Sequence, residues 1–379
     1  MRFSSVVGQH TLKQKLVQLV KAKHLPHAIL ILGKEGGGGL PMALALTTYI
    51  QCENKGEADS CGACSACIKM DKLQHPDVHF SYPTIRTSDM DRAPLSTDFI
   101  LPFREFVTQH PYGDAQRWIK SLGAEKQGNI TADECRDIIR KLSFRTFESE
   151  FKVMIIWYPE FLGVEGNILL KLIEEPTPKT ILIFVAVNAE QLLATIQSRC
   201  QLFPLQPLQT EEIQEALTRQ GALDEKAYQL ARIAEGNYDM ALQLLHNNDD
   251  DVQQLLRVWL NAMYTNKGLD LVSWVGELAE LSRESQKNFL SYTIQLLEHL
   301  LRFQYLGPEH VTLIASEQKI IETLLAKGLS AYAASGMAEE LNKSIYELER
   351  NANSKILFHS LSLRVQQLLL SKKSQLTQA

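Results

Sequence analysis

The sequence contains no apolar run of the ~18 residues that a membrane-spanning helix needs. Its first residues, MRFSSVVGQHTLKQK, also lack the uninterrupted apolar core of a signal peptide. From these two absences we expect that the chain is neither a membrane protein nor a secreted protein. They predict a cytoplasmic protein with no membrane partner.

The chain also lacks an excess of basic residues. It has 39 Lys and Arg against 44 Asp and Glu, which gives a formal net charge of -5. This balance argues against a protein that binds nucleic acid by its bulk charge, although a local basic face remains compatible with it. With 45% apolar and 22% charged residues, the composition is that of a globular protein.

Glycine and proline become scarce after Pro207, and the chain changes character there. Before it, apolar runs of strand length alternate with helical patterns, which predicts an α/β fold with a parallel sheet covered by helices on both faces. The runs lie at 28–32, 76–83, 151–159, 179–188 and 200–205. After it, apolar residues recur at helical spacing. We expect domains at 1–206, 207–250 and 251–379, joined near the HNNDDD segment 246–251, with a polar insertion at 84–129.

The stretch GKEGGGGL, residues 33–40, follows the first apolar run and precedes a helical pattern that begins near Pro41. This is the frame of a phosphate-binding P-loop, G-x-x-x-x-G-K-[ST], but the lysine and the hydroxyl are missing. Gly39 stands at the lysine position and Leu40 at the Ser/Thr position. The degenerate loop comprises Gly33, Gly36, Gly38, Gly39 and Leu40.

Four of the six cysteines lie within sixteen residues, at the spacing C-x8-C-x2-C-x2-C: Cys52, Cys61, Cys64 and Cys67. Four thiolates match the tetrahedral shell of structural zinc, and no histidine or carboxylate is needed to complete it. The alternatives are an iron–sulfur cluster, a redox pair at Cys61 and Cys64, and unconnected cytosolic thiols. The pattern favours a structural zinc site.

The stretch NILLKLIEEPTPKTILIFVAVNAEQLLATIQSRCQLFPL, residues 167–205, together with the cysteine cluster, resembles the clamp-loader group of AAA+ proteins. The resemblance covers residues 1–245 well. It implies a P-loop NTPase-like sheet of order 5-1-4-3-2, a three-helix lid at 207–250, and a helical collar at 251–379 through which five subunits form a ring. The implied partners are gamma/tau-type ATPase subunits, a delta subunit, primer–template DNA and, indirectly, the sliding clamp.

Residue by residue, the resemblance implies a chain that does not hydrolyse ATP. Besides Gly39 and Leu40, the strand that should end in Walker-B acids ends in Trp157 and Tyr158, with Glu160 displaced beyond them. The lid position that carries an arginine in active members holds Met240. Lysine, hydroxyl, acid and lid arginine are therefore absent together. Whether nucleotide binds through the glycine backbone stays open.

One functional arginine of the group is kept. The Ser198-Arg199-Cys200 triplet matches the motif whose arginine reaches the ATP of the neighbouring subunit. The resemblance implies that Arg199 is an arginine finger acting in trans; the alternative is an ordinary surface arginine. Asn188 matches a sensor position, but without a nucleotide beside it we expect it to cap the strand end.

A helix is predicted from Thr131, which is followed three residues later by Glu134 in a capping-box pattern. The basic residues on and after this helix are Arg136, Arg140, Lys141 and Arg145. In clamp loaders this region faces template-strand phosphates, so these residues are candidates for DNA contacts. A solvated helix face is the equally weighted alternative. The aromatic residues of the insertion are expected to form a local core, unless Tyr112 or Trp118 is exposed to a partner.

The sequence thus predicts a non-hydrolysing stator subunit of a clamp loader within a DNA polymerase holoenzyme at the replisome. Two rival hypotheses remain. An active gamma/tau-type ATPase would turn over ATP as an isolated chain, and a zinc-containing adaptor on a decayed AAA+ scaffold would have no affinity for clamp-loader subunits.

Overall fold

The computed structural model describes residues 1–87, 90–123, 128–246, 249–266, 268–281, 283–307, 311, 313, 315–350 and 352–370. The chain divides into two compact units, Met1–Gln243 and Leu244–Ala379. No helix within the described residues combines the length and hydrophobicity of a membrane span. The expected joint at 246–251 includes Asn247 and Asn248, which lie outside the described residues.

The first unit is built on a five-stranded parallel sheet of order β2-β3-β4-β1-β5. Read from the other edge, this is the 5-1-4-3-2 order that the resemblance implies, so the predicted fold class is confirmed. Each predicted apolar run contains one strand: β1 (Ala28–Leu32), β2 (Val78–Ser81), β3 (Lys152–Trp157), β4 (Thr180–Ala186) and β5 (Gln201–Pro204).

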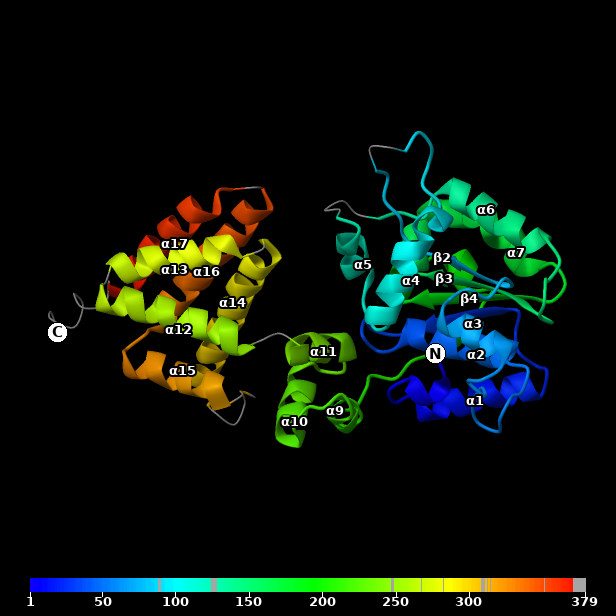
Figure 1. Ribbon diagram of the computed structural model, residues 1–379, viewed down its shortest axis with the longest axis horizontal. Helices are drawn as coiled ribbons and strands as arrows, with labels where there is room; N and C mark the ends of the chain where they lie inside the picture. Colours follow the sequence, from blue (N-terminus) through cyan, green and yellow to red (C-terminus); the bar gives the residue numbers. More distant parts are fainter. Residues whose placement is uncertain are drawn as a thin grey trace. The chain divides into compact units, whose positions relative to one another are not determined.

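The sheet forms the middle of three layers (Figure 1). Alternate side chains of one strand belong to different cores: Ile29 and Ile31 of β1 contact the cluster that contains α2, while Ala28 and Leu30 contact the cluster that contains α6. Side chains alternate between the faces of a strand, so a strand covered on both faces must be apolar throughout. This explains the continuous apolar runs.

The helices of this unit are α1 (His10–Lys21), α2 (Gly39–Gln51), α3 (Ser65–Asp71), α4 (Ile100–Gln109), α5 (Ala115–Ser121), α6 (Ala132–Ser143), α7 (Leu170–Glu174), α8 (Ala194–Gln197), α9 (Thr210–Arg219), α10 (Asp224–Ile233) and α11 (Tyr238–His246). Short 3-10 helices lie at η1 (Phe3–Ser5), η2 (Ser96–Phe99), η3 (Pro159–Leu169) and η4 (Ala189–Gln191). Between β3 and β4, η3 is therefore followed directly by the short α-helix α7.

The described aromatic residues of the insertion are buried and join the main core. Phe103 and Trp118 are fully buried, and their rings pack edge to face with centroids 5.4 Å apart. Phe103 also lies 5.8 Å from the ring of Trp157 at the end of β3. The expected local core is thus continuous with the core under the sheet. Tyr112 and Trp118 are both buried, so neither is the exposed partner residue considered above.

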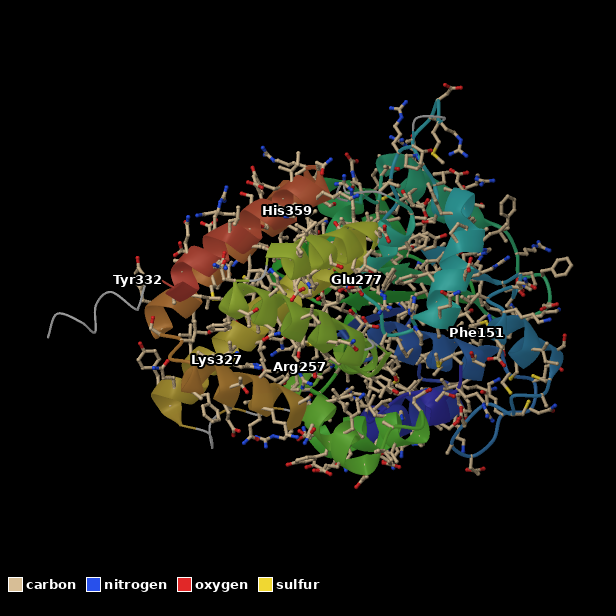
Figure 2. All side chains as sticks on the ribbon, turned by 60° about the vertical axis from the view of Figure 1, so that its left-hand side comes forward. Phe151, Arg257, Glu277, Lys327, Tyr332 and His359 are labelled. Carbon is tan, nitrogen blue, oxygen red and sulfur yellow. The ribbon has the colours of Figure 1, made fainter. Side chains whose placement is uncertain are left out.

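The second unit is all helical, as expected: α12 (Asp249–Thr265), α13 (Gly268–Glu280), α14 (Arg283–Leu306), α15 (Ala315–Ala326), α16 (Ala331–Glu349) and α17 (Ser354–Leu370). Trp259 and Trp274 stack at its centre with ring centroids 5.2 Å apart. Its surface carries exposed aromatic residues, among them Tyr332 at the start of α16, which is 81% exposed (Figure 2). The unit boundary at Gln243/Leu244 lies inside α11, so the predicted three-domain division stays a prediction.

Candidate functional site

The turn from β1 to α2 keeps the backbone shape of a phosphate-binding loop. Gly36 and Gly38 have φ angles of 68° and 94°, in the left-handed region that favours glycine, and Gly38 is the N-cap of α2. The glycines are therefore required by the path of the chain, whether or not a phosphate is bound. Leu40 at the hydroxyl position is buried, and it contributes to the core.

Side chains from the lid and the insertion lie directly against this loop. A Cβ atom on Gly36 would lie 1.8 Å from Oδ1 of Asn237, and one on Gly38 would lie 3.1 Å from the ring of Tyr112. The hydroxyl of Tyr112 accepts a hydrogen bond of 2.8 Å from the Val7 backbone N–H. The Tyr238 N–H donates to the carbonyl of Gly36 at 3.2 Å. The chain's own groups thus occupy positions next to the loop backbone.

The strand end that would carry Walker-B acids has a different role here. Trp157 is buried among the insertion aromatics, and the hydroxyl of Tyr158 donates to Oε1 of Glu35 at 3.4 Å. Oε1 of the displaced Glu160 accepts the N–H groups of Val187 and Asn188 at 2.6 and 2.8 Å. Burial raises the pKa of Glu160. Oε1 therefore links the ends of β3 and β4, while Oε2 is buried and accepts no hydrogen bond from the described residues.

The sensor position, Asn188, and the lid position, Met240, both take part in local backbone hydrogen bonds. Oδ1 of Asn188 accepts the N–H of Glu190 at 2.9 Å, so it caps η4, as the sequence reasoning expects of a strand-end residue. Met240 replaces the lid arginine on the first turn of α11, where its N–H donates to Oδ1 of Asn237 at 2.9 Å. Neither position offers a charge to a phosphate.

The four predicted zinc ligands come together. Their Sγ atoms all lie within 4.8 Å of one another, with Cys61 and Cys67 3.9 Å apart and Cys52 and Cys64 4.0 Å apart. Zn–S bonds of about 2.3 Å in a tetrahedron require S···S separations of about 3.8 Å. Cys52 is the C-cap of α2 and Cys64 the N-cap of α3, so the cluster fixes the connection between these helices.

Backbone donors surround the sulfurs. The N–H groups of Ala63 and Cys64 donate to Sγ of Cys61 at 3.4 and 3.3 Å, and they lower the pKa of its thiol to about 6. Burial has the opposite effect on Cys52 and raises its pKa. Cys135 and Cys200 are not part of the cluster. The donor set and spacing fit a closed structural metal site with no open position for substrate.

Arg199 lies between α8 and β5 and is exposed. Its Nε lies 2.5 Å from Oε1 of Glu174, the last residue of α7. Its Nη1 donates to the Thr195 carbonyl at 3.0 Å and to the Ser198 hydroxyl at 3.3 Å. The guanidinium is therefore anchored on one side, and the part of the chain that the structure describes offers no partner to Nη2.

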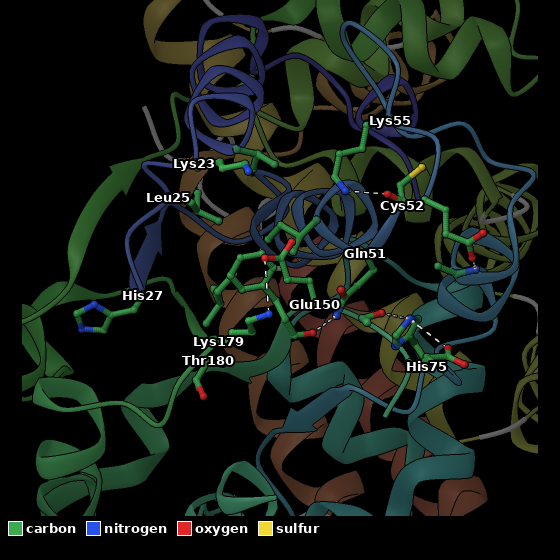
Figure 3. A pocket seen from close by; sticks show the side chains of 18 of the residues that line it. Lys23, Leu25, His27, Gln51, Cys52, Lys55, His75, Glu150, Lys179 and Thr180 are labelled. Atoms are coloured by element: carbon green, nitrogen blue, oxygen red, sulfur yellow. Dashed lines mark hydrogen bonds and ion pairs between the residues drawn. The ribbon is translucent and has the colours of Figure 1, made fainter. Parts of the chain in front are cut away.

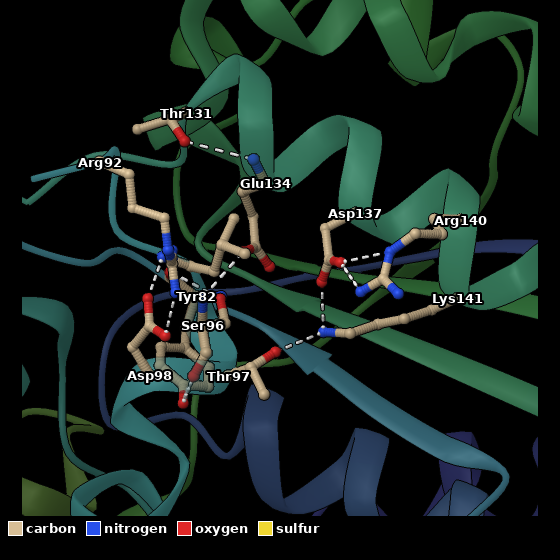
Figure 4. A network of polar contacts seen from close by, with 11 residues as sticks. Tyr82, Arg92, Ser96, Thr97, Asp98, Thr131, Glu134, Asp137, Arg140 and Lys141 are labelled. Carbon is tan, nitrogen blue, oxygen red and sulfur yellow. Dashed lines mark hydrogen bonds and ion pairs between the residues drawn. The ribbon is translucent and has the colours of Figure 1, made fainter.

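The basic residues of α6 are mostly paired with acids of the same helix (Figure 4). Arg136 Nη1 lies 2.6 Å from Asp133, and Arg140 pairs with Asp137. Lys141 Nζ lies 2.8 Å from Oδ2 of Asp137 and donates to the Thr97 hydroxyl of the insertion at 2.9 Å. Burial acts to raise the pKa of Asp137, but the hydrogen bonds from Lys141 and Arg140 outweigh it and lower the pKa.

The same network corrects one local prediction. Thr131 caps α6, with its hydroxyl oxygen 3.2 Å from the Glu134 N–H, as expected. Glu134, however, does not complete a capping box, because its Oε2 accepts the N–H of Ser96 in the insertion at 2.8 Å. Its burial raises the pKa of this carboxyl. Arg145 is exposed and has no ion pair within the described residues.

A pocket of about 790 Å³, which the sequence did not predict, is drawn in Figure 3. It lies at the end of the sheet opposite the P-loop. Its lining includes His27 and Lys179, which precede the first residues of β1 and β4, whereas the P-loop follows the last residue of β1. Lysine and glutamate side chains share the lining with apolar ones. Lys55 Nζ donates to the carbonyl of Cys52 at 2.7 Å, so this charge is already engaged.

Comparison with known proteins shows the family of the chain. The model of the family described as "DNA polymerase III, delta subunit" matches residues 8–209, which is more than half of the chain. The chain belongs to this family. The delta' subunit of Bacillus subtilis is 27% identical over 235 residues, 62% of this chain and 58% of that protein. The delta' subunit of Escherichia coli is 25% identical over 303 residues, 79% of this chain and 76% of that protein.

Gamma/tau subunits of DNA polymerase III also occur among the relatives. A gamma/tau subunit of Mycobacterium bovis is 25% identical over 218 residues, 57% of this chain and 31% of that protein. The chain thus spans less than two thirds of the length of the Bacillus subtilis delta' and Mycobacterium bovis relatives. The solved clamp-loader delta protein of Bacillus subtilis shares 13% identity, covers 94% of this chain and 99% of its own, and has a TM-score of 0.35.

Proposed function

We propose that this chain is a non-hydrolysing, delta-prime-like stator subunit of a bacterial DNA polymerase III clamp loader. In the assembled ring it helps to load the sliding clamp onto primed DNA and supplies Arg199 to the ATP site of a neighbouring gamma/tau-type subunit. The proposal rests on a contrast between two sites. The chain's own phosphate loop lacks the lysine and the hydroxyl that contact nucleotide and is lined by Tyr112 and Asn237, whereas Arg199 is exposed.

The absence of hydrolysis follows from several losses at once. No lysine or hydroxyl is present at positions 39 and 40, the strand end carries Trp157, and Glu160 is held by backbone N–H groups. Removing a single charge-stabilising group from a catalytic site costs factors of about 10² or more in rate. Four losses together leave no route to useful turnover. Tight nucleotide binding is also disfavoured, because the lysine and hydroxyl that contact phosphate and Mg²⁺ in a P-loop are both missing.

The role in trans rests on the chemistry of Arg199. A planar guanidinium can donate to two oxygens of a γ-phosphate and neutralise the charge that develops on them in the transition state. Such a finger contributes ~10³ to 10⁵ in rate in related phosphoryl-transfer systems. Arg199 follows the short helix α8 at the surface of its unit, so its side chain is accessible to another subunit.

Zinc has a structural role in this proposal. When bound by Cys52, Cys61, Cys64 and Cys67, the ion supplies a tetrahedral crosslink between the end of α2 and the start of α3. The remaining parts of the proposal are contacts of α6 with primer–template DNA, assembly with a delta subunit, and a location in the cytoplasm at the replisome. The DNA contacts have the least support, because Arg136 and Arg140 are paired with neighbouring acids.

The experiment is reconstitution of the clamp loader with gamma/tau-type subunits whose own finger arginine is replaced by alanine. In this ring, the ATP site that receives Arg199 is the site that still has a finger arginine. We expect Arg199→Ala to lower the DNA-stimulated kcat of this ring by ~10³. Arg199→Lys should restore little, because an ammonium lacks the planar fork. Size-exclusion chromatography controls for assembly, and an unchanged kcat in a fully assembled Arg199→Ala ring would overturn the proposal.

The two rival functions give different results in simpler assays. An active gamma/tau-type ATPase would hydrolyse ATP as an isolated chain. A zinc-containing adaptor would not join the ring at all, and Arg199→Ala would then change nothing. The proposed stator hydrolyses no ATP alone and is required for full turnover in the ring.

A further inference from the structure

We infer that Glu174 is a positioning residue for Arg199: its carboxylate holds the guanidinium by Nε and leaves Nη2 for the neighbour's phosphate. This inference rests on the proposed function of Arg199. The two residues are 25 positions apart in the sequence, and the fold brings Nε within 2.5 Å of Oε1.

Both ends of this contact are fixed by the core. Glu174 ends α7, whose residues Leu172 and Ile173 are buried, and Pro176 follows two residues later. Arg199 follows α8, which is anchored by the fully buried Ile196. The contact therefore joins two short helices whose backbones are set by the core on the α6 face of the sheet. The geometry of Arg199 is defined by these helices together and not by its own loop.

The pattern of hydrogen bonds leaves a defined part of the guanidinium available. Glu174 takes the Nε–H, and the Thr195 carbonyl and the Ser198 hydroxyl accept from Nη1. An unrestrained arginine side chain loses rotamer freedom when it is ordered. An arginine that is already ordered meets the phosphate with less of this loss, which is the physical content of preorganisation.

Because the Arg199–Glu174 pair is partly exposed, its removal tests the positioning of Arg199 with little effect on folding stability. The side chains of Arg199 and Glu174 are 35% and 48% exposed. A surface ion pair of this kind contributes little to folding. Removal of the Glu174 carboxylate therefore leaves the unit folded and acts on the orientation of Arg199. Because the finger interacts with charge that develops in the transition state, the effect falls on kcat and not on KM.

The test uses the same reconstituted ring, with one intact finger site. Glu174→Ala is expected to lower kcat about fivefold with KM for ATP unchanged. Glu174→Gln should recover most of the rate, since its amide oxygen still accepts from Nε. Glu174→Lys, which repels the guanidinium, should lower kcat further. The matched control is Glu175→Ala, an adjacent exposed carboxylate that has no ion pair with Arg199.

The outcomes separate this inference from the proposed function. If Arg199→Ala lowers kcat but Glu174→Ala matches the wild-type chain or exceeds it, the positioning role is overturned and the finger stands. A Glu174→Gln rate as low as that of Glu174→Ala would also overturn the role of Glu174 as hydrogen-bond acceptor. If Arg199→Ala itself has no effect in the assembled ring, the proposed function fails.

Discussion

Arg117 of the insertion and Asp239 of the lid form an ion pair in which Nη1 lies 2.9 and 3.1 Å from the two carboxylate oxygens. The residues are 122 positions apart, and the Asp239 side chain is only 7% exposed. Asp239 also accepts from Gln243 Nε2 at 2.6 Å. This contact, with the Tyr112–Tyr238 ring pair at 4.8 Å, fastens the insertion to the lid.

Removal of Arg117 should destabilise the first unit. Arg117→Ala leaves a buried carboxylate without its cation, which we expect to cost about 1–2 kcal/mol in the free energy of unfolding, since Arg117 itself is 31% exposed. Urea titration of the full chain measures it. Arg219→Ala, which breaks the exposed pair with Glu215, is the matched control and should cost about 0.5 kcal/mol or less. Equal effects of the two variants would contradict the buried role of Asp239.

Restoration of the P-loop residues alone should not restore ATP hydrolysis. In Gly39→Lys/Leu40→Thr, the consensus letters return, but Asn237 and Tyr112 still lie against the loop and no acid ends β3. In addition, a Cβ on residue 39 would lie 2.9 Å from Val185. We expect no turnover above background in a coupled ATPase assay of the isolated chain. Measurable turnover would contradict this prediction and would show that Asn237 and Tyr112 move aside when nucleotide binds.

Loss of metal should loosen the connection between α2 and α3. The wild-type chain is expected to contain about one equivalent of zinc by elemental analysis, and Cys61→Ser should reduce this content sharply because one of four thiolates is lost. Cys135→Ser is the control, since this buried cysteine lies outside the cluster. A strong chelator should increase proteolysis between residues 52 and 67. Full zinc retention in a variant with all four cysteines replaced would rule out the site.

Burial of His79 on β2 predicts a pH dependence of stability. Burial, followed by the charge of Lys141, lowers the pKa of His79 from 6.5 to about 4. The unfolded chain then binds the proton more readily, so this histidine's contribution is fully present above pH 6.5 and is lost as the pH falls through the folded pKa. Between pH 7 and 4.5 the loss should reach about 2 kcal/mol in the free energy of unfolding.

The measurement is a series of urea titrations of the wild-type chain and His79→Gln. The pKa values of His75 and His299 are lowered as well, mainly by burial, so only the difference between the two proteins reports His79. His24→Gln, at an exposed position, is the control and should keep the wild-type slope. A wild-type slope in His79→Gln would contradict the assignment.

The ion pairs of α6 make a sharp prediction for DNA binding by the assembled ring. If this helix faces phosphates, Arg145→Ala should weaken binding and reduce the salt dependence by about one counterion, since Arg145 is already unpaired within the described residues. Asp133→Asn should strengthen binding, because it releases Arg136. The two variants are compared by fluorescence anisotropy at several salt concentrations. No change in either variant would remove α6 from the interface.

The strands and the cysteine cluster could be predicted from the sequence because their signals are local. A buried parallel strand is apolar throughout, and metal ligands in C-x2-C turns are neighbours in the chain. The sheet order required the resemblance to a family. The groups beside the P-loop could not be predicted, because Tyr112 and Asn237 are 74 and 199 residues from Gly38 and carry no motif. Glu134 was misassigned because its partner, Ser96, lies in the insertion.

Trp157 at the end of β3 packs against the aromatic residues of the insertion. At the place where hydrolysing relatives of this fold need an acid, its ring is 97% shielded and lies 5.8 and 6.0 Å from the rings of Phe103 and Phe106. A return to an acidic residue would remove an aromatic anchor of the insertion, at a cost of about 3–5 kcal/mol, and would bury an unpaired charge. The ring at position 157 is therefore part of the core that holds the insertion on the sheet, and the fold constrains this position to an aromatic residue.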